Sequence, residues 1–335
     1  MSHHQQGRGG RGGRGERGGG RPQEPPLPKP YAFIPLPSQR PGLQKPAGHH
    51  RYQPGTLTGT LTAQIVARSP IHVASGLLEP LRNRDYPLVK GHFRTNDTLA
   101  IPATSLKGCI RSILETIAPA AITITRARPL PNEANPSNNL DRLDVAQRLF
   151  GTLGYQGCVR FRDALIEPDD ARSAIVPSVQ LFRPRSDAHD TYFDGRHPKG
   201  RKFYMHGTVA TGNLPLETCP VDSTFRLQLD FDNLTRGEVG LLLYALGLGV
   251  PRLWPKLGGS KPACLGTIEV SNPALVVLET SAAYTDFDAT PQPQVIEPLL
   301  KAAETEKLVL RNQLQQLADV LRWPREDRDC PHRNY

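Results

Sequence analysis

Regular alternation of apolar and polar side chains predicts the first long strand of the chain. Across residues 57–67, Leu, Gly, Ala and Ile alternate with Thr, Gln and Val, which is the pattern of a half-buried strand. A second alternation, across residues 225–231, places Phe and Leu on one side and Arg, Gln and Asp on the other. The segments 159–166 and 267–270 supply two further predicted strands.

Two helices are predicted between these strands. The first has its N-cap at Thr104 or Ser105, and its core-facing residues follow helical spacing: Leu106, Ile110, Ile113, Leu114 and Ile117. The second opens on a capping box of Thr235 and Glu238, and its apolar stripe is Val239, Leu242, Leu243 and Leu246. This β-α-β plus β-α-β order predicts an α+β protein with a ferredoxin-like, RRM-type core. Two long insertions, at about 70–100 and 177–216, interrupt the core, and the second is expected to form a hairpin.

We expect the core domain to span residues 55–275, after an arm formed by residues 1–54. The arm contains nine Lys or Arg and two Glu, whereas the remaining residues contain 32 basic and 30 acidic side chains. Most of the formal net charge of +9 therefore lies in the arm, and bulk charge supports a nucleic-acid partner only weakly.

The arm combines an RGG-type repeat at 7–21 with a Pro-rich segment at 22–46. Such a composition buries too little apolar area to offset its ordering entropy, so we predict disorder from residue 1 to about residue 29. The repeat fits either salt-sensitive contact with RNA or a solubilising tail. The segment 31–37 is more apolar, and we expect it to dock in extended form on the body or on a neighbouring subunit.

Residues 276–335 are predicted to form a Pro-rich linker and one long helix from about Glu297 to Trp323. Four leucines follow alternating four- and three-residue steps, as in a short coiled-coil seam: Leu310, Leu314, Leu317 and Leu321. Packing of this seam on the protein's own body is favoured over docking on an adjacent subunit.

Composition argues against several classes of protein. With a mean hydropathy of −0.43, no secretory signal and no long apolar run, we expect a cytoplasmic protein without membrane insertion. The five cysteines form no CxxC pair, so we expect reduced thiols and no zinc ribbon or finger, with Cys330 in the tail as incidental. No structurally bound cofactor is predicted.

Two lysine-bearing turns are candidate phosphate sites. At the predicted helix start, free backbone N–H groups lie close to Ser105, Lys107 and Arg111, and the two basic residues are one helical turn apart. The second turn is glycine-rich and consists of Gly258, Gly259, Ser260 and Lys261. Its glycines let the backbone approach a phosphate, and its lysine adds a positive charge. A nucleotide-binding P-loop is excluded because GxxxxGK[ST] is not met and a strand follows, while a plain hairpin turn remains the alternative.

The insertion 177–216 interleaves basic and aromatic side chains, a combination suited to single-stranded RNA. From this segment we predict RNA contacts by Arg201, Lys202, Tyr204 and His206. Three aspartates cancel part of the positive charge, so a solvated hairpin is the alternative.

An ordered set of motifs connects these segments. Leu149-Phe150-Gly151 is followed by the segment 157–164, and the turn 257–261 is closed by Leu265-Gly266 before a strand. Together with the segment 101–111, this order resembles the RAMP superfamily of CRISPR-associated proteins, specifically the Cas7-like backbone subunits of type III effector complexes. The segments 31–37 and 200–206 resemble the type III-D branch. The resemblance covers roughly residues 31–275.

The resemblance implies a guide-RNA-binding backbone subunit of a type III CRISPR interference complex that also binds target RNA. Sequence readout would then fall to base pairing. The implied partners are the CRISPR guide RNA, complementary target RNA, and other Cas7-like, Cas5-like, Cas11-like and Cas10-type subunits. Part of 177–216 would act as a thumb that wedges into the guide–target duplex.

A catalytic alternative stays open. Relatives that slice target RNA use an aspartate in the loop after the first strand, assisted by a divalent metal, and some carry zinc-binding insertions that this chain lacks. The nearest carboxylates here are Glu79 and Asp85. The alternative function is a metal-dependent endoribonuclease that slices target RNA or processes the guide precursor with Mg²⁺ or another divalent ion. A general RRM-like protein with an RGG tail is a third reading, but it leaves the ordered motifs unexplained.

Overall fold

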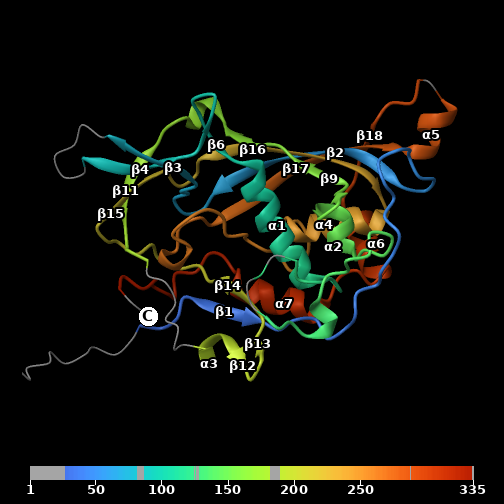
Figure 1. Cartoon of the computed structure of the whole chain (residues 1–335). Helices are drawn as coiled ribbons and strands as arrows, with labels where there is room; N and C mark the ends of the chain where they lie inside the picture. Colours follow the sequence, from blue (N-terminus) through green and yellow to red (C-terminus); the bar gives the residue numbers. More distant parts are fainter. Residues whose placement is uncertain are drawn as a thin grey trace, which may run out of the picture.

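The computed structural model describes residues 27–80, 87–123, 125, 128–181, 189–286 and 288–333 (Figure 1). Its largest sheet has the strand order β18-β17-β2-β16-β10-β6-β5, and β9 also pairs with β16. All of these pairs are antiparallel. The strands are β18 (Gln292–Gln294), β17 (Ile268–Glu279), β2 (Leu57–Ala67), β16 (Thr224–Leu234), β10 (Ala164–Ile166), β6 (Thr98–Ile101), β5 (Arg94–Thr95) and β9 (Val159–Phe161).

The centre of this sheet has the topology of a ferredoxin-like unit. If β2, β9 with β10, β16 and β17 are counted as strands one to four, their order across the sheet is 4-1-3-2. Helix α1 (Ala103–Ile117) lies between the first and second strands in the chain, and α4 (Arg236–Ala245) lies between the third and fourth. The α+β class and the ferredoxin-like core are thereby confirmed.

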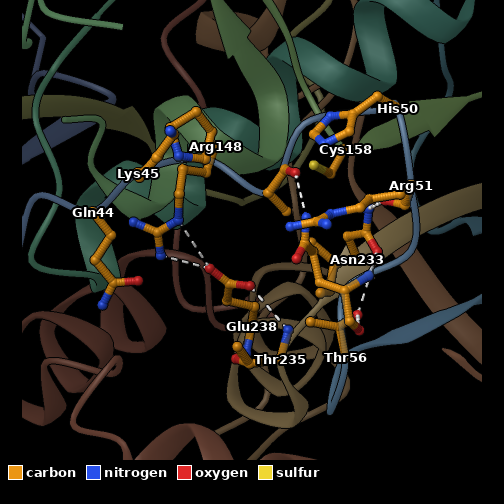
Figure 2. A pocket seen from close by; sticks show the side chains of 14 residues that line it. Gln44, Lys45, His50, Arg51, Thr56, Arg148, Cys158, Asn233, Thr235 and Glu238 are labelled. Carbon is orange, nitrogen blue, oxygen red and sulfur yellow. Dashed lines mark hydrogen bonds and ion pairs between the residues drawn. The ribbon is translucent and has the colours of Figure 1, made fainter. Parts of the chain in front are cut away.

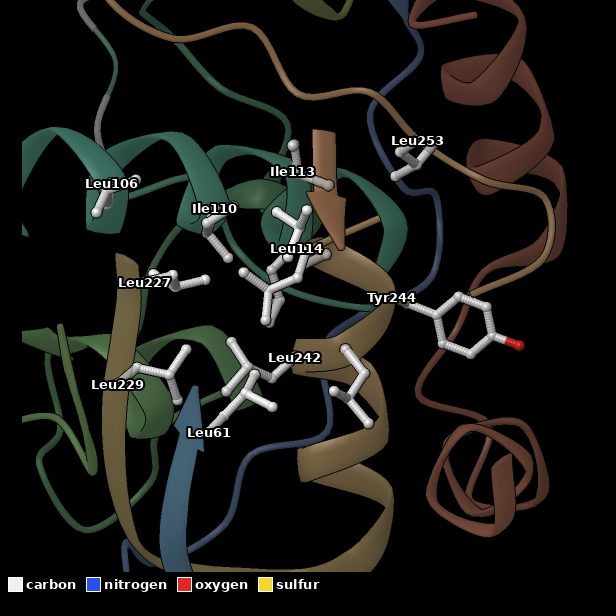
Figure 3. Close-up of a cluster of buried hydrophobic side chains, with 14 of the residues drawn as sticks. Leu61, Leu106, Ile110, Ile113, Leu114, Leu227, Leu229, Leu242, Tyr244 and Leu253 are labelled. Carbon is white, nitrogen blue, oxygen red and sulfur yellow. The ribbon is translucent and has the colours of Figure 1, made fainter. Parts of the chain in front are cut away.

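Both helices pack their apolar stripes on one face of the sheet (Figure 3). Alternation along β2 and β16 turns every second residue toward this face. Ile110 and Leu114 of α1 point toward the labelled side chains of the strands, with Leu242 of α4 beside them. The buried set includes Leu61, Leu106, Ile110, Ile113, Leu114, Leu227, Leu229 and Leu242. Removing side chains of this size from water stabilises the fold by about 1.5–3 kcal/mol each.

The two predicted insertions meet in a second sheet. It has the order β11 (Ala174–Ser178), β15 (Leu214–Thr218), β4 (Leu88–His92) and β3 (Ala74–Pro80). β15 and β4 are parallel, and they join segments that lie more than a hundred residues apart. The second insertion is therefore more than a single hairpin, because its ends belong to this sheet.

Smaller elements complete the described fold. β1 (Tyr31–Ile34) pairs with β14 (Arg201–Tyr204), so the arm segment 31–37 reaches the chain's own body as an extended strand. The other elements are α2 (Val145–Phe150), β7 (Gly151–Thr152), β8 (Tyr155–Gln156), α3 (His189–Tyr192), β12 (Phe193–Asp194), β13 (His197–Pro198), α5 (Thr280–Thr285), α6 (Glu297–Thr305) and α7 (Arg311–Val320). Three short 3₁₀ turns lie at Asn132–Ala134, Pro168–Asp170 and Lys261–Ala263. The predicted disorder of residues 1–29 falls largely on residues 1–26, which lie outside the described residues.

Three predicted boundaries differ from the structure. α1 begins at Ala103 after Pro102, not at a Thr104 or Ser105 cap. The segment 159–166 forms two strands, because Asp163 between them turns toward the start of α1. β17 continues through Pro273 to Glu279, and a register shift between Ser271 and Ala274 accommodates a residue that lacks a backbone N–H.

The predicted single C-terminal helix is wrong. α6 and α7 are separate helices, and Leu310 precedes α7 in extended conformation with its N–H donated to the carbonyl of Ile117. This contact fixes the break, because the peptide group that would continue a helix instead closes the end of α1. Leu314, Leu317 and Leu321 are buried in the main core, so they pack on the protein's own body.

The expectation of five reduced cysteines is also wrong. Cys264 and Cys330 form a disulfide, while Cys109, Cys158 and Cys219 are free. The tail cysteine is therefore part of the fold. Within the described part of the chain, every helix is too short or too polar to cross a lipid bilayer.

Candidate nucleic-acid interface

A carboxylate of the chain itself occupies the start of α1. The N–H of Ala103 donates to Oδ1 of Asp163 at 2.7 Å, and Oδ2 accepts from Thr95 Oγ1 at 2.9 Å. Asp163 thus supplies the cap that Pro102 cannot, since proline has no side-chain acceptor. The N–H of Ser105 donates to the Pro102 carbonyl at 2.9 Å. The predicted phosphate position on free N–H groups at Ser105 therefore needs correction.

Lys107 and Arg111 have different surroundings. Arg111 is buried, donates through Nε to Glu115 Oε1 at 2.7 Å, and lies over the ring of Phe150, so it holds the core and is not available to a phosphate. Lys107 is half-buried and has no hydrogen bond or ion pair among the described residues. Partial burial, followed by the nearby Arg111, lowers the pKa of Lys107. A phosphate beside Lys107 would relieve both effects.

The glycine-rich turn packs on the segment that follows β2. The N–H of Gly259 donates to the carbonyl of His72 at 2.7 Å. Gly258 has a φ of +83°, and a Cβ there would overlap the same carbonyl oxygen. Gly258 is thus explained by close packing of two backbones, which fixes the position of the turn.

Lys261 folds back onto its own turn. Its Nζ donates to the carbonyl of Gly258 at 2.6 Å, and burial lowers its pKa. The ammonium lies near the Cys109 thiol of α1, whose Sγ also contacts the carbonyl of Lys256 at 3.5 Å. The turn and the first half of α1 are therefore neighbours, but Lys261 is partly withdrawn from solvent.

Lys256 was not singled out from the sequence, because a lysine before Leu-Gly-Gly carries no motif signal. It is buried, donates through Nζ to the Met205 carbonyl at 2.7 Å, and has a pKa lowered to about 7 by burial and by Arg328 and Lys261. Among the described residues no carboxylate pairs with Lys256 or Lys261. The positive field behind the turn is consequently uncompensated.

Lys107 lies on α1, whose Cys109 meets the turn that carries Lys261. Residues two apart on a helix are separated by about 200°, so Lys107 points away from Cys109, which meets the turn. Gly108 lies between them, and a Cβ there would have open space. Lys90 of β4 is exposed. Burial lowers the pKa of His72, the residue on which the turn packs, and the positive charge of Lys90 lowers it further. We call Lys90, Lys107, Gly108 and Lys261 the basic strip.

Arg201 lies on β14 and connects the second insertion to α1. Its Nη1 donates to Glu115 Oε2 at 2.5 Å and its Nη2 donates to Ser112 Oγ at 2.9 Å. Glu115 is fully buried and also accepts from Arg111 and Thr123. Arg201 therefore neutralises an interior carboxylate, which corrects its predicted role in RNA binding.

Lys202 and Tyr204 belong to an aromatic cluster. The Nζ of Lys202 lies 4.7, 5.3 and 4.9 Å from the ring centroids of Tyr31, Tyr192 and Tyr204. Burial lowers the pKa of Lys202. These cation–π contacts hold β1, α3 and β14 together, so the two residues stabilise the docked arm.

His206 lies in the interior. Its Nδ1 is 2.8 Å from Thr267 Oγ1 and its Nε2 is 2.9 Å from the Trp254 carbonyl. Burial lowers the pKa of His206 to about 3. Its predicted contact with RNA is therefore wrong, because both ring nitrogens are used inside the protein.

The open face of the main sheet is charge-balanced. Arginines on this face pair with carboxylates in Arg160–Asp232 at 2.5 Å, Arg162–Asp230 at 2.9 Å and Arg226–Glu167 at 3.2 Å. The alternating polar residues of β16 carry arginine, glutamine and aspartate, with no aromatic side chain. Ordinary RRM domains stack bases on aromatics of this face, so the third reading of the sequence loses its binding platform.

Of the candidate catalytic carboxylates, Glu79 lies on β3 with an oxygen 3.6 Å from Arg94 Nη1. Asp85 lies outside the described residues. Within those residues, no group of three His, Cys, Asp or Glu side chains is arranged to hold a metal ion.

The fold is that of a ferredoxin-like α+β protein, in which α1 carries the half-buried Lys107 and meets the glycine-rich turn through Cys109. A sequence model of the RAMP superfamily matches residues 64–269, a range that includes α1 and the glycine-rich turn. The chain belongs to the RAMP superfamily, whose members are CRISPR-associated RNA-binding proteins that act in ribonucleoprotein complexes. Among curated proteins, none matches the chain.

Proposed function

We propose that this protein is a guide-RNA-binding backbone subunit of a type III, III-D-like CRISPR interference complex that also binds target RNA. The observation that carries this proposal is the RAMP match from residue 64 to residue 269, which contains every member of the basic strip. Other Cas7-like, Cas5-like, Cas11-like and Cas10-type subunits are the proposed partners, and the cytoplasm is the proposed location.

The chemistry of the basic strip supports backbone binding over base recognition. Lysine ammonium groups attract phosphates without reading sequence. Gly108 has no side chain to hold a sugar–phosphate chain away from the helix, and the space above it is open. Sequence readout is then left to guide–target base pairing.

The test uses Lys90→Ala with Lys107→Ala, because Lys261 is tied into its turn and its replacement would also disturb packing. For single-stranded RNA, each lost phosphate contact reduces the slope of log affinity against log salt by about 0.7. We therefore expect the double variant to bind RNA more weakly, to the same degree for unrelated sequences, and with a slope smaller by about 1.4. The measurement is fluorescence anisotropy over a salt series.

The matched control is Arg172→Ala with Lys301→Ala, which removes two exposed positive charges that are not members of the strip, one before β11 and one on α6. An equal loss in this control would mean that only bulk charge matters. Unchanged RNA affinity in the strip variant would overturn the proposed contact. Adding Mg²⁺ and complementary RNA to the assembled complex, with Glu79→Ala alongside, tests the endoribonuclease alternative in the same experiment.

A further inference from the structure

Figure 2 shows the side chains that line a polar cavity of about 440 Å³. This cavity lies at the other end of β2 from the glycine-rich turn. Thr56 lines it immediately before β2 begins, whereas the turn packs on His72 beyond the end of this strand. The eleven residues of β2 span roughly 35 Å at about 3.3 Å per residue. The cavity is therefore a separate site from the basic strip.

Residues 44–56 form the outer wall of the cavity and are fixed to the body at three places. Gln44 exchanges two backbone hydrogen bonds with Leu143, at 3.0 and 2.9 Å. The ring of His49 stacks on Tyr155, and its Nε2 is 2.7 Å from a carbonyl. The Nδ2 of Asn233 donates to the carbonyls of residues 48 and 51, at 3.2 and 3.0 Å. The wall is thus a built part of the fold.

The charged side chains at the floor of the cavity are paired with each other. Arg148 and Glu238 are both buried, and Nη2 of Arg148 donates to Oε1 of Glu238 at 2.5 Å. The other oxygen of Glu238 accepts from the N–H of Thr235 at 3.0 Å, which closes the capping box of α4. The only carboxylate among the described lining residues is therefore already neutralised.

The rim carries positive charge without a partner. Lys45 and Arg51 are exposed, and neither side chain has a hydrogen bond or ion pair among the residues that the structure describes. Counted over its Lys, Arg, Asp and Glu side chains, the lining has a net charge of +2, from Lys45, Arg51 and Arg148 against Glu238. Pro46, Ala47 and Leu234 add apolar wall, and Gln44 adds an amide.

We propose that this cavity binds a nucleoside monophosphate group, with Lys45 and Arg51 holding the phosphate. Its volume lies in the range of roughly 300–1,000 Å³ that is usual for ligand pockets, which suits one nucleotide and excludes a folded partner. The cations at the rim match the phosphate of a nucleotide, and the amide and the apolar wall match the rest of it. The group is either a free mononucleotide or the phosphorylated end of an RNA strand.

The test uses the full-length chain and isothermal titration with AMP and with adenosine. We expect saturable binding of AMP, at least tenfold weaker binding of adenosine, and at least tenfold loss of AMP affinity in Lys45→Ala with Arg51→Ala. The control Arg172→Ala with Lys301→Ala should bind AMP like the parent protein. No saturable AMP binding, equal binding of adenosine, or equal loss in the control would each overturn the site.

Two RNAs of one sequence, with and without a terminal phosphate, separate the two sources. A preference for the phosphorylated end that disappears in Lys45→Ala with Arg51→Ala assigns the cavity to an RNA terminus. AMP binding without such a preference assigns it to a free nucleotide. Lys90→Ala with Lys107→Ala should leave AMP binding unchanged. An experiment that contradicts RNA binding by the basic strip can therefore be told apart from one that contradicts nucleotide binding by the cavity.

Discussion

Buried histidines make the stability of this protein depend on pH. Burial lowers the pKa of His206 to about 3 and that of His92 to about 4. The ring of His92 accepts a hydrogen bond from the Val73 N–H at Nδ1, and Nε2 faces the Ala100 carbonyl. His92 is therefore fixed as a neutral tautomer, because a second ring proton would point at a donor, whereas His206 is kept neutral by burial.

We predict that the free energy of unfolding falls as the pH is lowered below 6.5. In this window the unfolded chain protonates both histidines while the folded protein does not, which costs about 3 kcal/mol between pH 6.5 and pH 5. Asp144 partly offsets this loss. Burial raises its pKa to about 6, so between pH 6.5 and pH 5 the folded protein binds this proton more strongly than the unfolded chain does, which stabilises the fold. A net loss of about 2 kcal/mol is expected.

Urea unfolding at the two pH values measures this loss. The variant His206→Asn should lose part of the histidine contribution to the pH dependence, whatever its stability at neutral pH, because burial also lowers the pKa values of His92 and His72. Equal unfolding free energies of the parent protein at pH 6.5 and pH 5 would contradict the neutral assignment of these rings.

At the scale of elements, two helical glycines have opposite surroundings. On α4, a Cβ at Gly240 would overlap the backbone carbonyl of Leu299 and crowd Ala303, because α6 lies directly against this helix. On α1, a Cβ at Gly108 would meet nothing within 4 Å. Glycine is a poor helix former in both places, so packing alone decides the outcome.

We predict that Gly108→Ala stabilises the protein by about 0.5–1 kcal/mol, the usual gain in helix propensity. Gly240→Ala should destabilise it, by about 1–3 kcal/mol, since the two helices must separate to admit a methyl group. Thermal and urea unfolding of the pair provide the measurement, and each variant is the control for the other. Equal shifts in the same direction would show that α6 does not pack on α4 as described.

The elements that sequence patterns predicted correctly are those whose pattern comes from burial on one face. The alternation of residues 57–67 coincides with β2, and the Thr235 capping box opens α4 as expected. The start of α1 and the break at Leu310 depend on partners distant in sequence, Asp163 and Ile117, which no local pattern indicates.

The candidate site was only partly predictable, because the sequence shows local features and not contacts between distant residues. A lysine near a turn can be read from the sequence, and Lys107 has the partner-free ammonium that the motif suggested. Whether a charged residue faces solvent or the interior depends on its tertiary partners. Arg201, for example, is directed inward by the buried carboxylate of Glu115.

At the scale of the whole molecule, the first and last segments that the structure describes are tied to the centre of the fold. The arm contributes β1, and the tail lies beside residues 206–208, where Arg328 Nη2 also donates to the Lys29 carbonyl at 3.2 Å. The Cys264–Cys330 disulfide joins this tail to the end of the glycine-rich turn. The position of the turn behind the basic strip is therefore linked to the C-terminal tail by a covalent bond.

We predict that this disulfide stabilises the folded state by about 2–4 kcal/mol. It closes a loop with a sequence separation of 66 residues, and chain entropy alone gives about 4 kcal/mol for a loop of this length. A reductant should therefore lower the urea midpoint of the parent protein, whereas Cys330→Ser should start from a lower midpoint and not respond to reductant. Thiol titration of the denatured, unreduced protein should find three free thiols, from Cys109, Cys158 and Cys219. Five free thiols, or a midpoint of the parent protein indifferent to reductant, would contradict this bond, and the tail would then be held only by hydrogen bonds such as that from the Cys330 N–H to Thr208.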